Sequence, residues 1–82
     1  MHYYLLFTSD HCKSCPQMKK NVQSLNLGHW EFNVDGTEGS KIAQEYNVRS
    51  LPTFMVLKGM EPKDELNRAI GLWPVEKIKE II

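Results

Sequence analysis

The sequence has little of several features that would set its class by themselves. Its 82 residues include only two cysteines, and ten Lys and Arg balance ten Asp and Glu, which leaves a net charge of +0. A neutral chain has no electrostatic feature that predicts nucleic acid or an anionic membrane as a partner. No apolar run approaches the ~20 residues of a membrane-spanning helix, and two cysteines cannot form the disulfide scaffold of a small secreted domain. We therefore expect one globular domain over residues 1–82, present as a monomer.

The first seven residues, Met1–Phe7, are apolar but do not resemble a secretory signal. They carry no basic leader, and Thr8–His11 follow without a small-residue cleavage site. We expect a cytoplasmic protein for this reason. In a reducing compartment, a close pair of cysteines is more often catalytic or metal-binding than structural.

Strand and helix patterns alternate along the chain. His2–Thr8 is rich in apolar and aromatic residues and is typical of a buried strand. In Cys12–Leu27 the apolar positions step by three or four, which predicts a helix with one buried face, and Gly28 is placed to end it in the left-handed conformation. The same criteria predict further elements at Trp30–Val34 (strand), Thr37–Tyr46 (helix, with Thr37 as its cap), Thr53–Leu57 (strand), Asp64–Leu72 (strand) and Pro74–Ile82 (helix).

This element order, β-α-β-α-β-β-α, limits the topology. A strand–helix–strand unit of this length favours a parallel pair of strands with a right-handed crossover. The short turn at Lys58–Pro62 joins only antiparallel neighbours. We therefore predict an α/β fold with a four-stranded mixed sheet and helices on both faces. Because its strand alternates apolar and polar residues, Trp30 is expected in the core.

Cys12 and Cys15 lie between the first predicted strand and the helix that follows it. At the start of a helix, two cysteines at this spacing bring their sulfurs within disulfide distance. The positive end of the helix favours the Cys12 thiolate, which is the nucleophile, whereas Cys15 falls on the buried face. Lys13 adds a cation beside Cys12 and favours its thiolate further. The pair predicts disulfide exchange, in which Cys12 attacks a substrate disulfide and Cys15 then attacks Cys12 to release the reduced substrate.

Two other interpretations of the cysteine pair compete with this one. A structural zinc site needs four ligands, usually with a second pair at regular spacing, and His2, His11 and His29 supply no such pair. We therefore expect no metal. Two core cysteines could also lie close without a redox role. A C-x-x-C motif beside a strand–helix–strand pattern favours the redox interpretation.

With these residues in view, the chain resembles the thioredoxin superfamily over essentially its whole length. It is similar to the minimal form shared by glutaredoxins, by the glutaredoxin-like redoxins that serve ribonucleotide reductase, and by small archaeal or phage thioredoxins, without the first thioredoxin strand and helix. Cys12–Cys15 matches the active-site motif, and Arg49–Thr53 matches the segment in which the family carries an aliphatic residue, Pro and Thr. Lys58–Gly59 resembles the hairpin turn, and Gly71 the glycine before the last helix.

The resemblance implies a substrate-binding segment as well as a redox pair. It implies a cis peptide bond between Leu51 and Pro52, which turns the Leu51 backbone toward the cysteines. There the Leu51 N–H and C=O would pair with an extended substrate peptide, as one added strand does. It also implies protein disulfides as substrates, no cofactor, ribonucleotide reductase as a client, and thioredoxin reductase or glutathione as the electron donor.

Three features near the cysteines depart from the family pattern. The family usually has Trp before the first cysteine and Gly-Pro between the pair, where this chain has His11 and Lys13–Ser14. A buried acid six residues before the first cysteine is replaced by Leu6. The proton acceptor for the second step is therefore open between Asp10, His11 and water. In the other interpretation, His11 is a loop residue that modulates Cys12 electrostatically.

A fourth departure concerns the electron donor. Glutaredoxins bind glutathione partly through polar residues just after the glycine that precedes the last helix, where this chain has Leu72–Trp73. This favours thioredoxin reductase over glutathione as donor. Trp73 either lines an apolar peptide groove or packs against the fold. Three functions stay open at this point: a redoxin that reduces protein disulfides, a glutathione-dependent glutaredoxin, and a binding module on the same fold.

Overall fold

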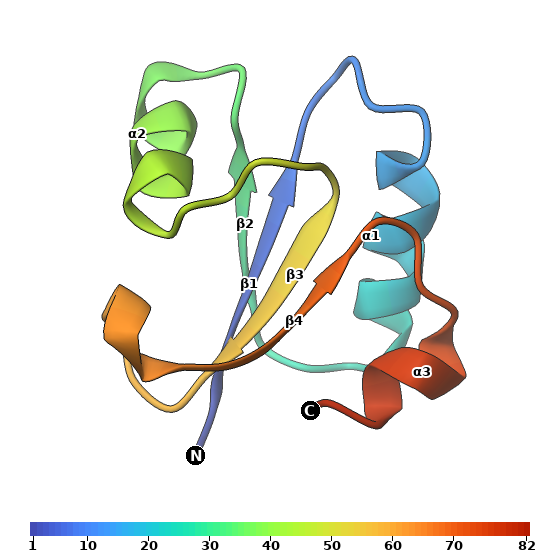
Figure 1. Cartoon of the computed structure of the whole chain (residues 1–82). Helices are drawn as coiled ribbons and strands as arrows, with labels where there is room; N and C mark the ends of the chain where they lie inside the picture. The colour runs from blue at the N-terminus through green and yellow to red at the C-terminus, as the bar shows by residue number, and fades with distance from the viewer.

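Strands and helices alternate along the chain in the order that the sequence predicts (Figure 1). The structure is a computed structural model that describes all residues, 1–82. Its elements are β1 (Tyr3–Thr8), α1 (Cys15–Ser24), β2 (Trp30–Asn33), α2 (Thr37–Glu45), β3 (Thr53–Leu57), a 3₁₀ turn (Pro62–Asp64), β4 (Glu65–Ile70) and α3 (Val75–Lys79). None of the three helices has the length and apolar character that crossing a bilayer requires.

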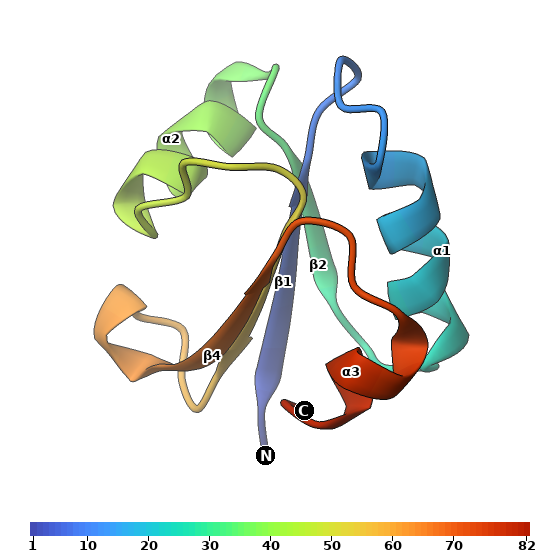
Figure 2. The same cartoon turned by 45° about the vertical axis from the view of Figure 1, so that its right-hand side comes forward.

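The four strands form one mixed sheet in the order β2-β1-β3-β4. The β1 strand pairs with β2 in parallel and with β3 antiparallel, and β3 pairs antiparallel with β4. Helices α1 and α3 cover one face of the sheet, and α2 covers the other (Figure 2). The predicted fold class, an α/β fold with a four-stranded mixed sheet and helices on both faces, is confirmed.

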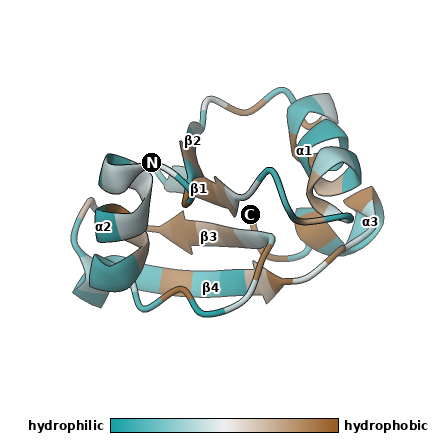
Figure 3. Cartoon of the chain, turned by 90° about the horizontal axis from the view of Figure 1, so that it is seen from above, coloured by the Kyte–Doolittle hydropathy of each residue, from teal (hydrophilic) through white to brown (hydrophobic).

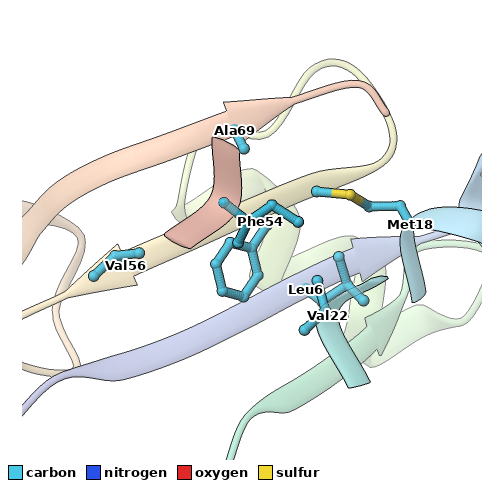
Figure 4. Packing of buried hydrophobic residues seen from close by; sticks show 7 residues of the cluster. Leu6, Met18, Val22, Phe54, Val56 and Ala69 are labelled. Atoms are coloured by element: carbon cyan, nitrogen blue, oxygen red, sulfur yellow. The ribbon is translucent and has the colours of Figure 1, made fainter. Parts of the chain in front are cut away.

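Each face of the sheet has its own apolar core, because successive side chains of a strand point to opposite faces. Phe54 and Leu6 belong to the core under α1 and α3, where Figure 4 shows them packed with side chains from α1. The neighbouring residues Met55 and Leu5 belong to the core under α2. Seen from above, the central strands β1 and β3 are the most apolar part of the sheet, and the helices carry most of their polar residues outward (Figure 3).

Helix α1 differs from the sequence prediction at both ends. It begins at Cys15 with Ser14 as its N-cap, so Cys12 lies in the preceding turn and not in the helix. It ends at Ser24, and the left-handed residue after it is Asn26, with φ 59°, rather than Gly28. Asn reaches this conformation because its short polar side chain hydrogen-bonds locally. The predicted Gly28 cap is therefore wrong.

Helix α2 begins at Thr37, but the predicted Thr37 cap is wrong, because Gly36 occupies the N-cap position. Gly39 lies on the face of α2 that meets β2. A Cβ atom at this position would overlap the backbone carbonyl of Asn33. The absence of a side chain at Gly39 thus lets α2 lie directly against the end of β2, and this contact fixes the turn that connects them.

Trp30 is the clearest error of the sequence prediction, because its side chain is 48% exposed. It is the first residue of β2, an edge strand of the sheet. Its register partner is Leu5, so it points to the α2 face, but at the end of the sheet away from α2 (Figure 1). Its ring instead lies beside that of Tyr3, with 5.9 Å between the ring centroids.

The last two elements are shorter than the sequence predicts. The β4 strand runs from Glu65 to Ile70, because Asp64 belongs to the preceding 3₁₀ turn. Helix α3 covers only Val75–Lys79, with Pro74 as its N-cap. Both elements nevertheless pack where the pattern places them, and Ile78 of α3 is fully buried.

Candidate active site

Cys12 and Cys15 form a disulfide bond, with 5.4 Å between their Cα atoms. Cys15 is the first residue of α1 and is only 3% exposed, whereas Cys12 is half-buried in the turn before the helix. The sulfur of Cys12 is thus bonded to a residue at the positive end of α1. The two cysteines that sequence analysis singled out therefore differ in access, with Cys12 as the more accessible one.

Backbone hydrogen bonds shape the turn that carries the cysteines. The Cys12 N–H donates to the Ser9 carbonyl at 3.3 Å, and the Cys15 N–H donates to the Cys12 carbonyl at 3.4 Å. The Ser14 hydroxyl lies 3.8 Å from the Cys12 sulfur. The turn therefore closes on itself, and it brings the two cysteine side chains together without help from a distant segment.

Sequence analysis missed Asp35, which anchors this turn to the rest of the protein. The Ser9 hydroxyl donates to both carboxylate oxygens of Asp35 at 2.8 and 3.0 Å, and the Asp10 N–H donates at 2.8 Å. The side chain of Asn33 adds a donor to the Asp10 carboxylate at 3.0 Å. The hydrogen bond from the Asp10 backbone, followed by that from Ser9, lowers the pKa of Asp35.

This network joins the loop after β1 to the loop after β2. The only sequence signal for it is that Asp35–Gly36 follows a strand parallel to β1, because the carboxyl ends of parallel neighbours meet at one edge of a sheet. Sequence analysis assigned Asp35 to a turn and nothing more. Its carboxylate holds in place the redox turn, the segment Ser9–Cys15 that carries both cysteines.

His11 and Lys13 lie in the same turn and are both exposed. The His11 N–H donates to the Ser9 hydroxyl at 3.1 Å, but neither the His11 nor the Lys13 side chain makes a hydrogen bond or a salt bridge within the chain. Their place beside Cys12 fits an electrostatic influence on its sulfur. That modulating role stays a prediction for both residues.

Leu51 and Pro52 lie at the same edge of the sheet as the cysteines. The bond between them is cis, as the resemblance implies. Phe7 near the end of β1 pairs with Thr53 at the start of β3, so the segment before β3 reaches the loop that follows β1 (Figure 2). The Pro52 carbonyl accepts a hydrogen bond from the Gly71 N–H at 2.8 Å, whereas the Leu51 N–H and C=O bond to no other group of the chain.

Trp73 packs against the core under α1 and α3 and is half-buried. Its indole N–H donates to the Ile70 carbonyl at 3.2 Å, and its own carbonyl accepts from the Asn21 side chain at 2.9 Å. These contacts fix Trp73 between β4 and α1. Contact of Trp73 with a substrate stays a prediction.

A pocket of about 350 Å³ opens beside the disulfide. It is lined by Thr8, Ser9, Asp10, Cys12, Cys15, Pro16, Lys19, Glu31 and Asn33. Most of these side chains are polar, so the pocket accepts water more readily than an apolar side chain. No cluster of three or more His, Cys, Asp or Glu side chains is arranged to hold a metal ion.

Comparison with known proteins places this geometry in one family. The thioredoxin family model matches residues 2–82. The H-type thioredoxin of Brassica oleracea is 33% identical over 63 residues, which are 73% of this chain and 51% of that protein, so the chain spans about half the length of the curated relatives it matches.

Solved structures agree with the family model. The thioredoxin of Thermus thermophilus is 28% identical, with a TM-score of 0.73 over 98% of this chain and 70% of that one. The germline-specific thioredoxin Deadhead of Drosophila melanogaster is 26% identical, with a TM-score of 0.78 over 96% of this chain and 75% of that one. The β-α-β-α-β-β-α order, the cysteine pair at the start of α1 and these matches together show that the chain belongs to the thioredoxin family.

Proposed function

We propose that this chain is a dithiol electron carrier that reduces disulfide bonds in other proteins. The observation that carries the proposal is the Cys12–Cys15 disulfide at the start of α1, in which Cys12 is half-buried and Cys15 almost fully buried. A nucleophile has to meet its substrate, whereas a resolving thiol has to meet only its neighbour. The asymmetry therefore supports attack by Cys12 and resolution by Cys15.

The reaction proceeds by two thiol–disulfide exchanges. In the reduced protein, the Cys12 thiolate attacks one sulfur of the substrate disulfide, and the other substrate sulfur leaves as a thiolate. Cys15 then loses its proton and attacks the Cys12 sulfur, which breaks the mixed disulfide and frees the second substrate thiolate. The dithiol gives up two electrons and two protons, and the substrate receives them. The result is the disulfide present in this structure.

The Leu51 backbone supports a peptide-binding role. Its N–H and C=O are free of internal hydrogen bonds at the same edge of the sheet as the cysteines. An extended peptide that pairs with these two groups would present its disulfide near Cys12. The two backbone bonds give affinity for any sequence, which suits a carrier with several clients.

The electron donor we propose is a flavoenzyme of the thioredoxin reductase type. The compartment we propose for the protein is the cytosol. Leu72 is 49% exposed before α3, and Pro74 at the N-cap of α3 has no N–H to offer a ligand. This apolar rim suits a protein surface better than the charged groups of glutathione. Ribonucleotide reductase, whose turnover leaves an oxidised cysteine pair, is the client we propose to test first.

A glutathione-dependent activity is the second candidate, and the exposed Lys13 favours it. Lys13 directly follows Cys12 in the chain, and its exposed side chain forms no salt bridge, so its ammonium group is free to meet a glutathione carboxylate. The comparison of the two donors is therefore part of the test.

Insulin reduction tests the proposal. The assay is coupled in one arm to NADPH and thioredoxin reductase, and in the other to glutathione and glutathione reductase. We expect turnover in the first arm to be faster and to vanish in both Cys12→Ser and Cys15→Ser. We also expect Cys15→Ser to accumulate a mixed disulfide with insulin, and Cys12→Ser not to do so. Faster turnover with glutathione would make the chain a glutaredoxin in function, and no turnover in either arm would refute a reductase role.

A further inference from the structure

The pocket beside the disulfide joins the buried cysteine to a carboxylate on the neighbouring strand. Cys15 and Lys19 line its helical wall, and they are one turn apart, so their side chains lie on the same side of α1. The wall opposite comes from the sheet and includes Glu31 of β2. Cys15 and Glu31 therefore line the same pocket, one from α1 and the other from the sheet.

The strand register explains why Glu31 faces the pocket. Glu31 pairs with Leu6 of β1, and paired residues of parallel neighbours point to the same face of the sheet. Leu6 lies in the core under α1 and α3, so Glu31 faces α1 from one strand further out. The Lys19 ammonium group lies 3.1 Å from the Glu31 carboxylate, which holds that carboxylate at the α1 wall.

Cys15 needs a proton acceptor that the exposed groups of the redox turn supply poorly. Its side chain is only 3% exposed, and its thiol must lose a proton before it can attack Cys12. His11 does not line the pocket. Asp10 does, but its carboxylate accepts a hydrogen bond from Asn33 at the exposed rim. Glu31 is the other carboxylate of the pocket, and its side chain is 29% exposed.

We propose that Glu31 accepts the proton of Cys15 through water in this pocket, an inference that rests on the proposed function. As the Cys15 S–H bond breaks, the proton passes to the carboxylate, and the thiolate forms its bond to the Cys12 sulfur. The bond between Cys12 and the substrate breaks, and the substrate sulfur leaves with the electron pair. Glu31 then returns its proton to solvent. About 350 Å³ holds several water molecules at roughly 30 Å³ each, enough for such a relay.

Three titratable side chains from neighbouring segments surround the Glu31 carboxylate. Lys19 of α1 is at 3.1 Å, the His29 ring nitrogen before β2 is at 3.6 Å, and Asp10 stands across the pocket. Lys19 thus places a positive charge directly beside the Glu31 carboxylate. Lys19 also favours the Cys15 thiolate once it forms, because an adjacent cation stabilises the charged form of a thiol.

Stopped-flow reaction of the reduced protein with one equivalent of Ellman's reagent, 5,5′-dithiobis(2-nitrobenzoate), separates the two exchanges. Attack by Cys12 releases the first equivalent of coloured thiolate, and resolution by Cys15 releases the second. The variant is Glu31→Gln, and Glu76→Gln in α3 is the control, since it removes the same charge from an exposed position.

We expect Glu31→Gln to slow the second release at neutral pH by on the order of 10- to 100-fold, at or below the 10²–10⁴ that a positioned base usually contributes. The first release should not change. The deficit should disappear at alkaline pH, where the Cys15 thiol ionises without help. An unchanged second release at neutral pH, or a deficit that persists at alkaline pH, would overturn the role of Glu31. If the wild-type protein itself gives no second release, the proposed function fails instead.

Discussion

On the α1/α3 face of the sheet, seven buried residues from the strands and two helices form the core, whereas on the α2 face the core has six buried residues and one helix of nine residues covers it. On the α1/α3 face this packing is joined by the Asn21–Trp73 hydrogen bond and the Lys19–Glu31 ion pair, and Cys15 is a buried residue of α1 there. A helix as short as α2 has little stability of its own. Contacts with the rest of the protein therefore have to hold α2 in place.

Hydrogen bonds add to the packing that holds the end of α2 against the rest of the protein. The guanidinium of Arg68 on β4 donates to the carbonyls of Tyr46 and Asn47 at the end of α2, and it is also paired with Glu65. The hydroxyl of Tyr46 donates to the Met60 carbonyl, and burial raises the pKa of that hydroxyl. The comparison teaches that apolar packing buries Cys15 on one face, while on the other face directional hydrogen bonds at the end of α2 add to the packing of that helix.

The largest expected effect is that of Phe54→Ala on the α1/α3 face. Phe54 is fully buried and stacks on Tyr4, so its loss leaves a cavity and should cost about 3–5 kcal/mol of unfolding free energy. Urea unfolding measures this cost. In the reduced variant, Cys15 should also react faster with iodoacetamide, because the wall behind α1 has loosened. Leu66→Ala, at an exposed position on β4, is the control. A cost near that of the control would remove the distinction between the two faces.

Gly39→Ala tests the close approach on the α2 face. The added methyl group must push α2 away from the Asn33 carbonyl, and overpacking of this kind costs about 1–3 kcal/mol. Urea unfolding of Gly39→Ala and of Lys41→Ala, an exposed position on the same helix, gives the comparison. Reactivity of Cys15 should not change in either variant. A Gly39→Ala protein as stable as the wild type would show that α2 does not need this contact.

Arg68→Met tests the polar attachment of α2. It removes charge-assisted hydrogen bonds to two carbonyls of the helix end, and we expect a loss of about 1–2 kcal/mol. The control is Lys63→Met, which removes the same charge from the exposed pair with Glu61 and should change stability by less than about 0.5 kcal/mol. Equal losses from the two variants, measured by thermal unfolding, would contradict a specific role for Arg68.

The smallest expected effect is that of Asp35→Asn, and it depends on pH. The folded state lowers the pKa of Asp35 from its ordinary 3.8, so the carboxylate contributes stability above that pH and loses it as the pH falls through the folded value. At neutral pH the variant should therefore be slightly less stable than the wild type, and the difference should shrink toward zero as the pH falls progressively below the ordinary pKa of 3.8. Urea unfolding across this range checks the sign. A difference that grows in acid would refute the assignment.

Most of the fold follows from local patterns, and the errors occur where distant elements decide the outcome. The alternation of apolar strands with helical periods gave the element order and the mixed sheet. The same periodicity wrongly placed Cys12 inside a helix. In the structure the Cys12 N–H donates to the Ser9 carbonyl in a separate turn, and a pattern of apolar positions does not reveal such a bond. Alternation likewise predicted Trp30 in the core, because it does not show that Trp30 begins an edge strand, where the residue stays 48% exposed.

The same limit applies to the site. The pairing of Cys12 with Cys15 was predictable because they are three positions apart in the sequence, a spacing that allows a disulfide bond at the start of a helix. The contacts of Ser9 with Asp35 and of Lys19 with Glu31 join segments that only the pairing of β1 with β2 and the packing of α1 bring together. No pattern within one segment marks them. The contact of Asp35 with the redox turn and the presence of Glu31 in the pocket that Cys15 lines are therefore seen only in the structure.

The central pairing of β1 with β3 has a consequence for the order in which this protein matures. It joins residues as far apart in the sequence as Tyr3 and Leu57, so it must close a long loop and is expected late in folding. The strand–helix–strand unit with the cysteines and the β3–β4 hairpin are each local and can form earlier. Cys12 and Cys15 therefore come within reach of each other before Leu51 joins them. In a newly synthesised chain the two cysteines are therefore expected to meet before the Leu51 segment is in place beside them.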